Sequence, residues 1–170
     1  MTNKNKRALL IEKAEQFFFE AMRHGWASGE AEFAVTQLPN SKIKTWTFPS
    51  EPKDFKLMDS YYVANSNRSY IGIKVLYHDK KLIWYMSYGG WYEKRAIALL
   101  KEALMHSYKH NQFRGARGPA SFYNNSLYPG ILYTNHFNPF GFGRFRGREF
   151  ITDGFGKVLG EHNGFGGLVI

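Results

Sequence analysis

Three arginines occupy alternate positions in one short segment near the C-terminus. Arg144, Arg146 and Arg148 lie two residues apart, so in an extended strand their side chains project from one face. Like charges this close repel one another unless water or an anion meets them, and the planar guanidinium suits phosphate and carboxylate groups. The spacing predicts a face that meets water or an anion. In the second case, Arg114 and Arg117 from a glycine-containing loop would complete a basic cluster.

Glu149 falls on the opposite face of the same predicted strand, together with Phe145 and Ile151. A carboxylate in apolar surroundings either has a hydrogen-bonding partner or has a raised pKa. We expect Glu149 to have a structural role, paired with an arginine or a tyrosine. The alternative is an enzyme that uses Glu149, His162 or Asp59 in acid–base chemistry.

Metal and nucleophile chemistry have little support in the sequence. The chain has no cysteine, which excludes disulfides, thiolate catalysis and cysteine-based zinc sites. His106 and His110 have the i,i+4 spacing of a helical metal site, but no acidic third ligand is close in the sequence. No P-loop, G-x-S-x-G or H-E-x-x-H motif occurs. We therefore expect no metal, no cofactor and no assigned catalytic residue, and we favour a binding domain over an enzyme.

The elements that position these residues are organised around a predicted hairpin at residues 70–90. Apolar side chains occupy both faces of its two strands, 70–77 and 82–88, and residues 78–81 form a polar turn. Residues 145–167 resemble a second copy of this hairpin. Each copy follows another strand-like run, at 57–64 and 127–134, and a helix, the first ending near His24 and the second spanning 91–108.

The pattern predicts an α+β fold made of tandem α-β-β-β repeats. About six strands would form one antiparallel sheet with two long helices packed on it. At 170 residues the chain fits a single domain, with repeat one at about 7–90, repeat two at about 91–170, and a frayed segment at 1–6. Residues 26–52 are irregular, and they either cover a pocket or form a surface loop without a ligand.

Charge and hydropathy limit the partners. The formal net charge is +9, with a pI near 9.7, which favours an anionic partner such as nucleic acid, a phosphorylated ligand or an acidic protein. No signal peptide and no apolar run of membrane-spanning length is present. We expect a cytoplasmic protein that does not contact a membrane.

Several short motifs, spread over nearly the whole chain, carry a family resemblance. They are F-F-x-E-A in the first helix, Asp59-Ser60-Tyr61, Ile83-Trp84-x-Met86-x-Tyr88-Gly89-Gly90, Phe113-Arg114-Gly115 with Gly118-Pro119, Phe145-x-Gly147-x-Glu149-x-Ile151, and Gly166-Gly167. In this order they resemble a bacterial family known as the domain of unknown function DUF5680. The family's F-R-G-P is interrupted here by Ala116 and Arg117, and its glutamate after the first hairpin glycine is replaced around Ile73-Lys74.

The resemblance implies a regulatory or ligand-sensing role, because some relatives carry a helix-turn-helix of the XRE type. This chain resembles a stand-alone member without that module. The family has no established catalytic residue to carry over.

Our first hypothesis is a domain that binds a small anionic or aromatic ligand in a cleft with aromatic walls. The alternative is binding of nucleic acid or acidic protein through a basic face. The candidate ligand-binding residues are Trp84, Tyr88, Trp91, Arg114, Arg117, Tyr133, Arg146 and Glu149.

Overall fold

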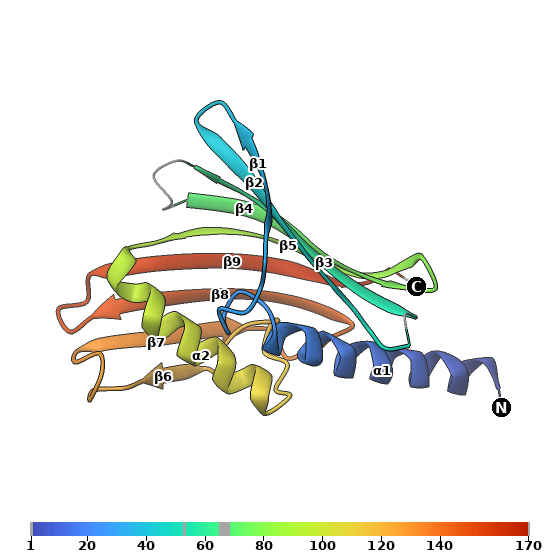
Figure 1. The fold of residues 1–170 in the computed structure, drawn as a ribbon. Helices are drawn as coiled ribbons and strands as arrows, with labels where there is room; N and C mark the ends of the chain where they lie inside the picture. Colours follow the sequence, from blue (N-terminus) through green and yellow to red (C-terminus); the bar gives the residue numbers. More distant parts are fainter. Residues whose placement is uncertain (1, 53, 65–68, 170) are drawn as a thin grey trace.

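The computed structural model describes residues 2–52, 54–64 and 69–169. Within them the chain forms one antiparallel sheet of nine strands and two α-helices, α1 (Asn3–Arg23) and α2 (Ile97–Lys109), with a short 3-10 turn, η1 (Lys94–Ala96), before α2 (Figure 1). The strands are β1 (Ala34–Leu38), β2 (Ser41–Pro49), β3 (Phe55–Ala64), β4 (Ser69–His78), β5 (Lys81–Tyr92), β6 (Ser121–Tyr123), β7 (Ile131–Phe137), β8 (Arg144–Asp153) and β9 (Val158–Leu168). Their order across the sheet is β1-β2-β3-β4-β5-β9-β8-β7-β6.

The predicted hairpins form, and they meet at the centre of the sheet. Strands β4 and β5 turn at Asp79 and Lys80, which both have positive φ, as a tight two-residue hairpin turn requires. Strands β8 and β9 form the second hairpin, and β9 pairs with β5. Gly90 lets these two strands pack closely, since a Cβ there would lie 2.1 Å from the Glu161 carbonyl oxygen.

Both helices pack on one face of the sheet, where the core lies (Figure 1). Phe17, Phe18 and Phe19 of α1 are all buried. The Phe18 ring lies 5.2 Å from the ring of Trp84 on β5, and α2 buries Leu99, Leu100, Ala103 and Leu104. Apolar burial of this kind is the main favourable contribution to folding. It anchors both helices against the sheet.

The predicted fold class was wrong, because the protein is mostly β. The six expected strands correspond to β3, β4, β5, β7, β8 and β9, and the sheet has three more, β1, β2 and β6. Five strands follow α1 and four follow α2, so the chain is not a tandem of α-β-β-β units. Two of the missed strands are short, with five residues in β1 and three in β6, and β2 has Lys42 and Lys44 on the same face as Trp46 and Phe48.

Three local predictions also need correction. The second helix was expected to begin at Trp91, but β5 continues through Tyr92 and the α-helix begins at Ile97. The segment 26–52 was read as irregular, whereas most of it forms the β1–β2 hairpin. In addition, α1 is helical from Asn3, inside the stretch that was expected to fray; Met1 lies outside the described residues.

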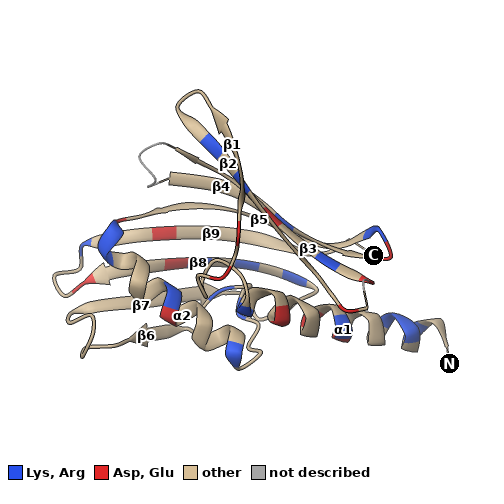
Figure 2. Ribbon diagram, viewed as in Figure 1, with Lys and Arg blue, Asp and Glu red and all other residues tan. Residues whose placement is uncertain are grey.

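The other face of the sheet carries exposed side chains. Ile71 on β4 is 64% exposed and Phe165 on β9 is 54% exposed. Arg144, Arg146 and Arg148 project from this face of β8, as predicted from their spacing; Figure 2 shows the basic bands on β8.

No helix in residues 2–52, 54–64 and 69–169 is long and apolar enough to cross a membrane.

Candidate functional site

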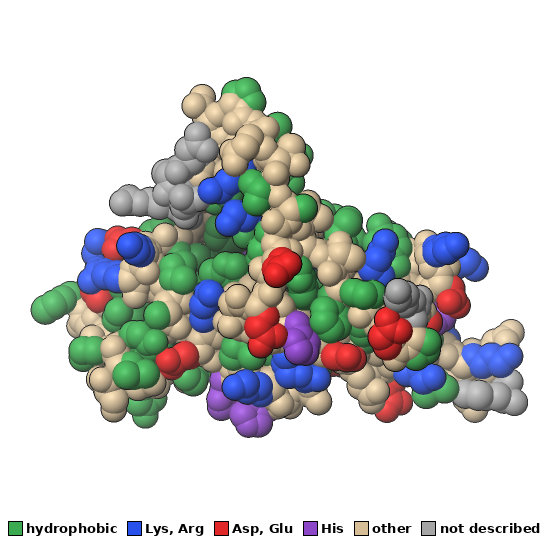
Figure 3. All heavy atoms as spheres, viewed as in Figure 1, with side chains coloured by type: hydrophobic (Ala, Val, Ile, Leu, Met, Phe, Trp, Pro, Cys, Tyr) green, Lys and Arg blue, Asp and Glu red, His purple; other side chains and the backbone are tan. Residues whose placement is uncertain are grey.

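A cavity of about 440 Å³ lies between the helices and the sheet. Figure 3 shows the molecular surface hollowed below the β1–β2 hairpin, with hydrophobic side chains inside the hollow and basic side chains beside it. The lining comes from α1, α2, five strands and two loops: Met22, Trp26, Ala27, Lys42, Lys44, Asp59, Tyr61, Val63, Tyr70, Lys74, Met86, Tyr88, Tyr92, Ile97, Leu100, Leu104, Tyr108, Ala116, Arg117 and His162.

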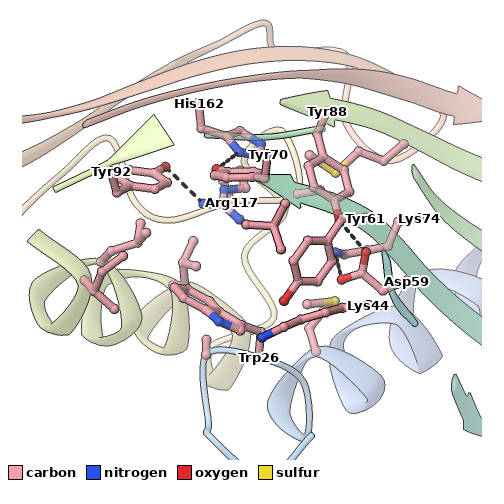
Figure 4. A pocket seen from close by; sticks show the side chains of 18 of the residues that line it. Trp26, Lys44, Asp59, Tyr61, Tyr70, Lys74, Tyr88, Tyr92, Arg117 and His162 are labelled. Atoms are coloured by element: carbon pink, nitrogen blue, oxygen red, sulfur yellow. Dashed lines mark hydrogen bonds and ion pairs between the residues drawn. The ribbon is translucent and has the colours of Figure 1, made fainter. Parts of the chain in front are cut away.

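A buried ion pair forms one part of the cavity wall (Figure 4). Asp59 and Lys74 are direct partners across β3 and β4, and Lys74 Nζ lies 2.5 Å from Asp59 Oδ2. The Tyr88 hydroxyl donates to the other carboxylate oxygen at 2.5 Å. Burial lowers the pKa of Lys74 and outweighs the opposing effect of Asp59. Burial also raises the pKa of Tyr88, and Asp59 adds to this rise, so Tyr88 stays a hydrogen-bond donor.

A second buried ion pair lies behind the floor of the cavity. Arg117, from the loop between α2 and β6, donates to both oxygens of Glu149 at 2.5 and 3.0 Å. Tyr133 donates to the same carboxylate at 2.6 Å, and Tyr92 donates to it as well. Burial is the largest single influence and opposes the charge on Arg117, but Glu149, Tyr92 and Tyr108 together outweigh it and raise the pKa of the guanidinium. The predicted pairing of Glu149 with an arginine or tyrosine is confirmed.

His162 connects the two halves of the sheet. Its Nδ1 lies 2.7 Å from the Tyr70 hydroxyl, and its ring stacks on Tyr88 with centroids 5.5 Å apart. Burial, with Arg117 and Lys74 nearby, holds the pKa of His162 well below its usual value, so the ring is neutral near pH 7. Its Nε2 is buried and has no hydrogen-bond partner among the described residues. Such an atom is a potential contact for a bound polar group.

Two lysines on β2 give the cavity its excess charge. Lys42 and Lys44 pair in register with Val63 and Tyr61 of β3, so they lie on the helix-covered face. No carboxylate within 4.0 Å pairs with either ammonium group in the described part of the chain. The other lining cations, Lys74 and Arg117, are neutralised by Asp59 and Glu149, which leaves two positive charges uncompensated.

The structure brings together only some of the predicted ligand-binding residues. Tyr88 and Arg117 line the cavity, and Tyr133 and Glu149 support Arg117 from behind. Trp84 is instead a core residue whose ring stacks on Phe142 at 5.1 Å.

The remaining predicted residues lie elsewhere. Trp91 and Arg146 lie on the opposite face of the sheet, because side chains alternate between the faces along a strand. Arg114 is not among the residues that line the cavity, and its backbone carbonyl accepts a hydrogen bond from the side chain of Asn135. The basic cluster considered from the sequence does not form, since Arg117 and the three β8 arginines lie on opposite sides of the sheet.

Several cavity residues were missed by sequence reasoning. Three of them lie on one face of the β4–β5 hairpin: Tyr70, Lys74 and Tyr92. The sequence did contain one indication of a buried charge there, because Lys74 alternates with Tyr70 and Leu76 on the same strand face. Lys42 and Lys44 were missed because their segment was read as a loop. Of the acid–base candidates, Asp59 and His162 line the cavity.

His106 of α2 and His110, the residue that follows α2, have ring centroids 4.7 Å apart. His110 Nδ1 lies 2.7 Å from the backbone carbonyl of His106. Within residues 2–52, 54–64 and 69–169, no three His, Asp or Glu side chains are grouped to hold a metal ion.

Comparison with known proteins gives one result. Searches of the curated proteins and of the solved structures found no match. The model of a domain of unknown function, DUF5680, matches residues 59–169. This region contains β4 to β9, α2 and the part of β3 from Asp59 onward, which supply most of the cavity lining. Because the match covers more than half of the chain, the protein belongs to the DUF5680 family.

Proposed function

We propose that this domain binds a small organic anion with an apolar or aromatic body in the cavity between the helices and the sheet. The observation that carries the proposal is a cavity of about 440 Å³ whose lining combines apolar side chains with two uncompensated lysines and with His162, whose Nε2 has no hydrogen-bond partner among the described residues. Small-molecule sites have this volume range and this combination of apolar lining with few polar groups.

The apolar part of the ligand would lie against the helices. Met22 of α1, Leu100 and Leu104 of α2, and Met86 of β5 line this side. Methionine side chains adapt to irregular shapes and contact aromatic rings favourably. Tyr88 adds a ring whose hydroxyl is already bound to Asp59, so it offers its ring to the ligand.

The anionic group would lie near β2. Lys42 and Lys44 are the two lining cations without a carboxylate partner in the described part of the chain, and charge-assisted hydrogen bonds to a carboxylate or phosphate are about twice as strong as neutral ones. The two buried ion pairs are satisfied by the protein. They fix the shape of the site, and they neither demand nor repel a ligand charge.

His162 would provide a directional contact at the floor. With Nδ1 at the Tyr70 hydroxyl, the neutral ring leaves Nε2 for a ligand donor or acceptor, according to its tautomer. This contact would favour ligands with a hydroxyl, amide or ring nitrogen at that depth.

Thermal unfolding against paired ligands tests the proposal. The panel contains aromatic and aliphatic carboxylates and phosphate monoesters, each with its neutral amide or alcohol. A ligand that binds the native state raises the melting temperature in proportion to its occupancy. We expect an anionic member to stabilise the protein more than its neutral partner. The fluorescence of 8-anilinonaphthalene-1-sulfonate, displaced by that ligand, would give the affinity.

The K42Q/K44Q variant makes the test specific. It should weaken the best anionic ligand about tenfold, the effect expected from losing a charge-assisted contact, and leave its neutral analogue unchanged. The K13Q/K109Q variant removes the same charge from exposed positions on α1 and α2 and should not alter affinity. Equal binding of the anion by both variants, or no stabilising ligand in the panel, contradicts the proposal.

A further inference from the structure

The face of the sheet opposite the helices is not accounted for by the cavity. Both helices lie on the other side (Figure 1), and Tyr62, Ile71, Ile73 and Phe165 are exposed here. The backbone groups of its central strands are paired within the sheet. A partner must therefore be recognised by side chains, because strand addition is not available at the centre of the sheet.

The β8 side of this face carries free positive charge. Arg148 forms an ion pair with Glu161 at 3.0 Å and lies over the Phe150 ring. Arg144 and Arg146 are exposed, and neither guanidinium forms an ion pair with a described residue. Alternate residues of a strand lie about 6.7 Å apart, so these two side chains present adjacent cationic groups.

An exposed aromatic ring lies directly beside these arginines. Phe165 is paired with Arg146 across β8 and β9, and with Ser87 on its other side. On the same face, Gly167 of β9 lies between Arg144 of β8 and Tyr85 of β5, since it pairs with both residues. Ser87 and Gly167 are small, and the Phe165 side chain is exposed. A groove on this face is lined by Arg144, Arg146 and Phe165. Phe140, in the turn before β8, also lines this groove and is 70% exposed.

We propose that this basic and aromatic face binds single-stranded nucleic acid, with phosphates at Arg144 and Arg146 and a base stacked on Phe165. A positively charged groove with exposed rings is the combination that sequence-tolerant single-strand binding uses. An acidic protein would use the arginines, whereas a single strand uses both the arginines and the exposed Phe165 ring beside them. The net charge of +9 adds long-range attraction for a polyanion.

The test is fluorescence anisotropy with fluorescein-labelled dT20 and rU20, and with a dA20·dT20 duplex as a comparison, at 50 to 200 mM salt. We expect the single strands to bind more tightly than the duplex, with affinity that falls as salt rises. The R144Q/R146Q variant should lower affinity at least tenfold and reduce the salt slope by about 1.4, since each phosphate contact on a single strand contributes about 0.7.

The F165T variant separates stacking from charge. It should weaken single-strand binding about tenfold, as loss of one stacking ring does, without changing the salt slope. Phe155, which is 100% exposed in the β8–β9 turn, provides the matched control F155T, and K13Q/K109Q is the control for lost charge. Both controls should bind as the wild type does.

Three results would overturn the proposal. The first is no binding of either single strand at 50 mM salt. The second is binding that R144Q/R146Q and F165T leave unchanged. The third is a face already occupied by a second copy of this chain, seen as a dimer in size-exclusion chromatography that F165T converts to monomer. The K42Q/K44Q variant, which changes the cavity, should bind the oligonucleotides as the wild type does. The nucleic-acid proposal and the cavity proposal can therefore fail independently of each other.

Discussion

The carboxylate of Glu149 depends on its partners because it has no contact with water. Its side chain is fully buried, and Arg117, Tyr92 and Tyr133 donate to its two oxygens. Desolvating a charge costs several kcal/mol, and only close pairing compensates for that cost. The group therefore holds the loop that carries Arg117 against β7 and β8.

Replacing Glu149 with glutamine should strongly destabilise the protein. The change leaves Arg117 buried without a counter-charge, for which a loss of about 3–5 kcal/mol in the free energy of unfolding is expected. Urea denaturation at pH 7 measures this. Glu161, whose partner Arg148 is exposed, provides the control E161Q with a loss below about 1 kcal/mol. Similar losses for the two variants would show that Arg117 regains solvent or another partner.

His162 should make stability fall in mild acid. Its pKa is well below the usual value because of burial and the charges of Arg117 and Lys74; Tyr70 and Tyr88 also face it. The unfolded chain takes up a proton below about pH 6.5 while the folded chain does not, so stability is lost as pH falls from there toward the folded pKa. At pH 5 the loss from this residue is at most about 2 kcal/mol.

The H162Q variant tests that assignment. Glutamine does not titrate, so the difference in unfolding free energy between pH 7 and pH 5 should be smaller in the variant than in the wild type, by at most about 2 kcal/mol. Parallel pH profiles for the two proteins would mean that His162 accepts a proton in the folded state.

At the level of elements, the sequence indicated the strands whose side chains alternate clearly. In β8 the arginines and the residues Phe145, Glu149 and Ile151 fell on opposite faces as expected. The β4–β5 hairpin was also located correctly, but both of its faces are apolar in the sequence. Periodicity alone therefore could not show that Lys74 points inward and Ile71 outward.

The candidate site was predictable only in part for the same reason. Arg117, Tyr88 and Glu149 were identified from residue type, because buried charges and aromatic rings mark concave sites. Lys42 and Lys44 could not be found, because β2 has lysines on its inner face where a strand pattern requires apolar residues. A cavity removes that requirement, and only the assembled sheet reveals the cavity.

Close packing between β5 and β9 should make Gly90 intolerant of a side chain. In G90A the new methyl group would lie 2.1 Å from the Glu161 carbonyl oxygen, a backbone atom that cannot move away cheaply. We expect a loss of at least about 1–3 kcal/mol, measured by thermal or urea unfolding. At Gly154, where the nearest atom would be 3.6 Å away, G154A should be nearly neutral. A stable G90A protein would require that β5 and β9 can separate.

For the whole molecule, the family region and the folding unit differ in extent. The match covers residues 59–169, yet α1 contributes Phe17, Phe18 and Phe19 to the core. Phe18 contacts Trp84 and Phe142, with ring centroids 5.2 and 5.9 Å apart. Removing α1 would expose these large rings to water.

A fragment of residues 59–170 should consequently fail to unfold cooperatively. Loss of a helix that buries three phenylalanine side chains, at about 1.5–3 kcal/mol each, is comparable to the whole stability of a typical domain. Circular dichroism during heating would show a broad change in place of a sharp transition. A sharp transition close to that of the full chain would show that α1 is dispensable.

The two edge strands of the nine-stranded sheet differ in how readily a strand of another molecule could pair with them. Strand β6 has only three residues, too few to template another strand, whereas β1 has five, all exposed, with Val35 and Leu38 among them. Unpaired edge backbone next to exposed apolar side chains favours intermolecular strand pairing. At high concentration, self-association should therefore begin at β1, which makes this hairpin the position where a single charged or proline residue would most improve colloidal stability.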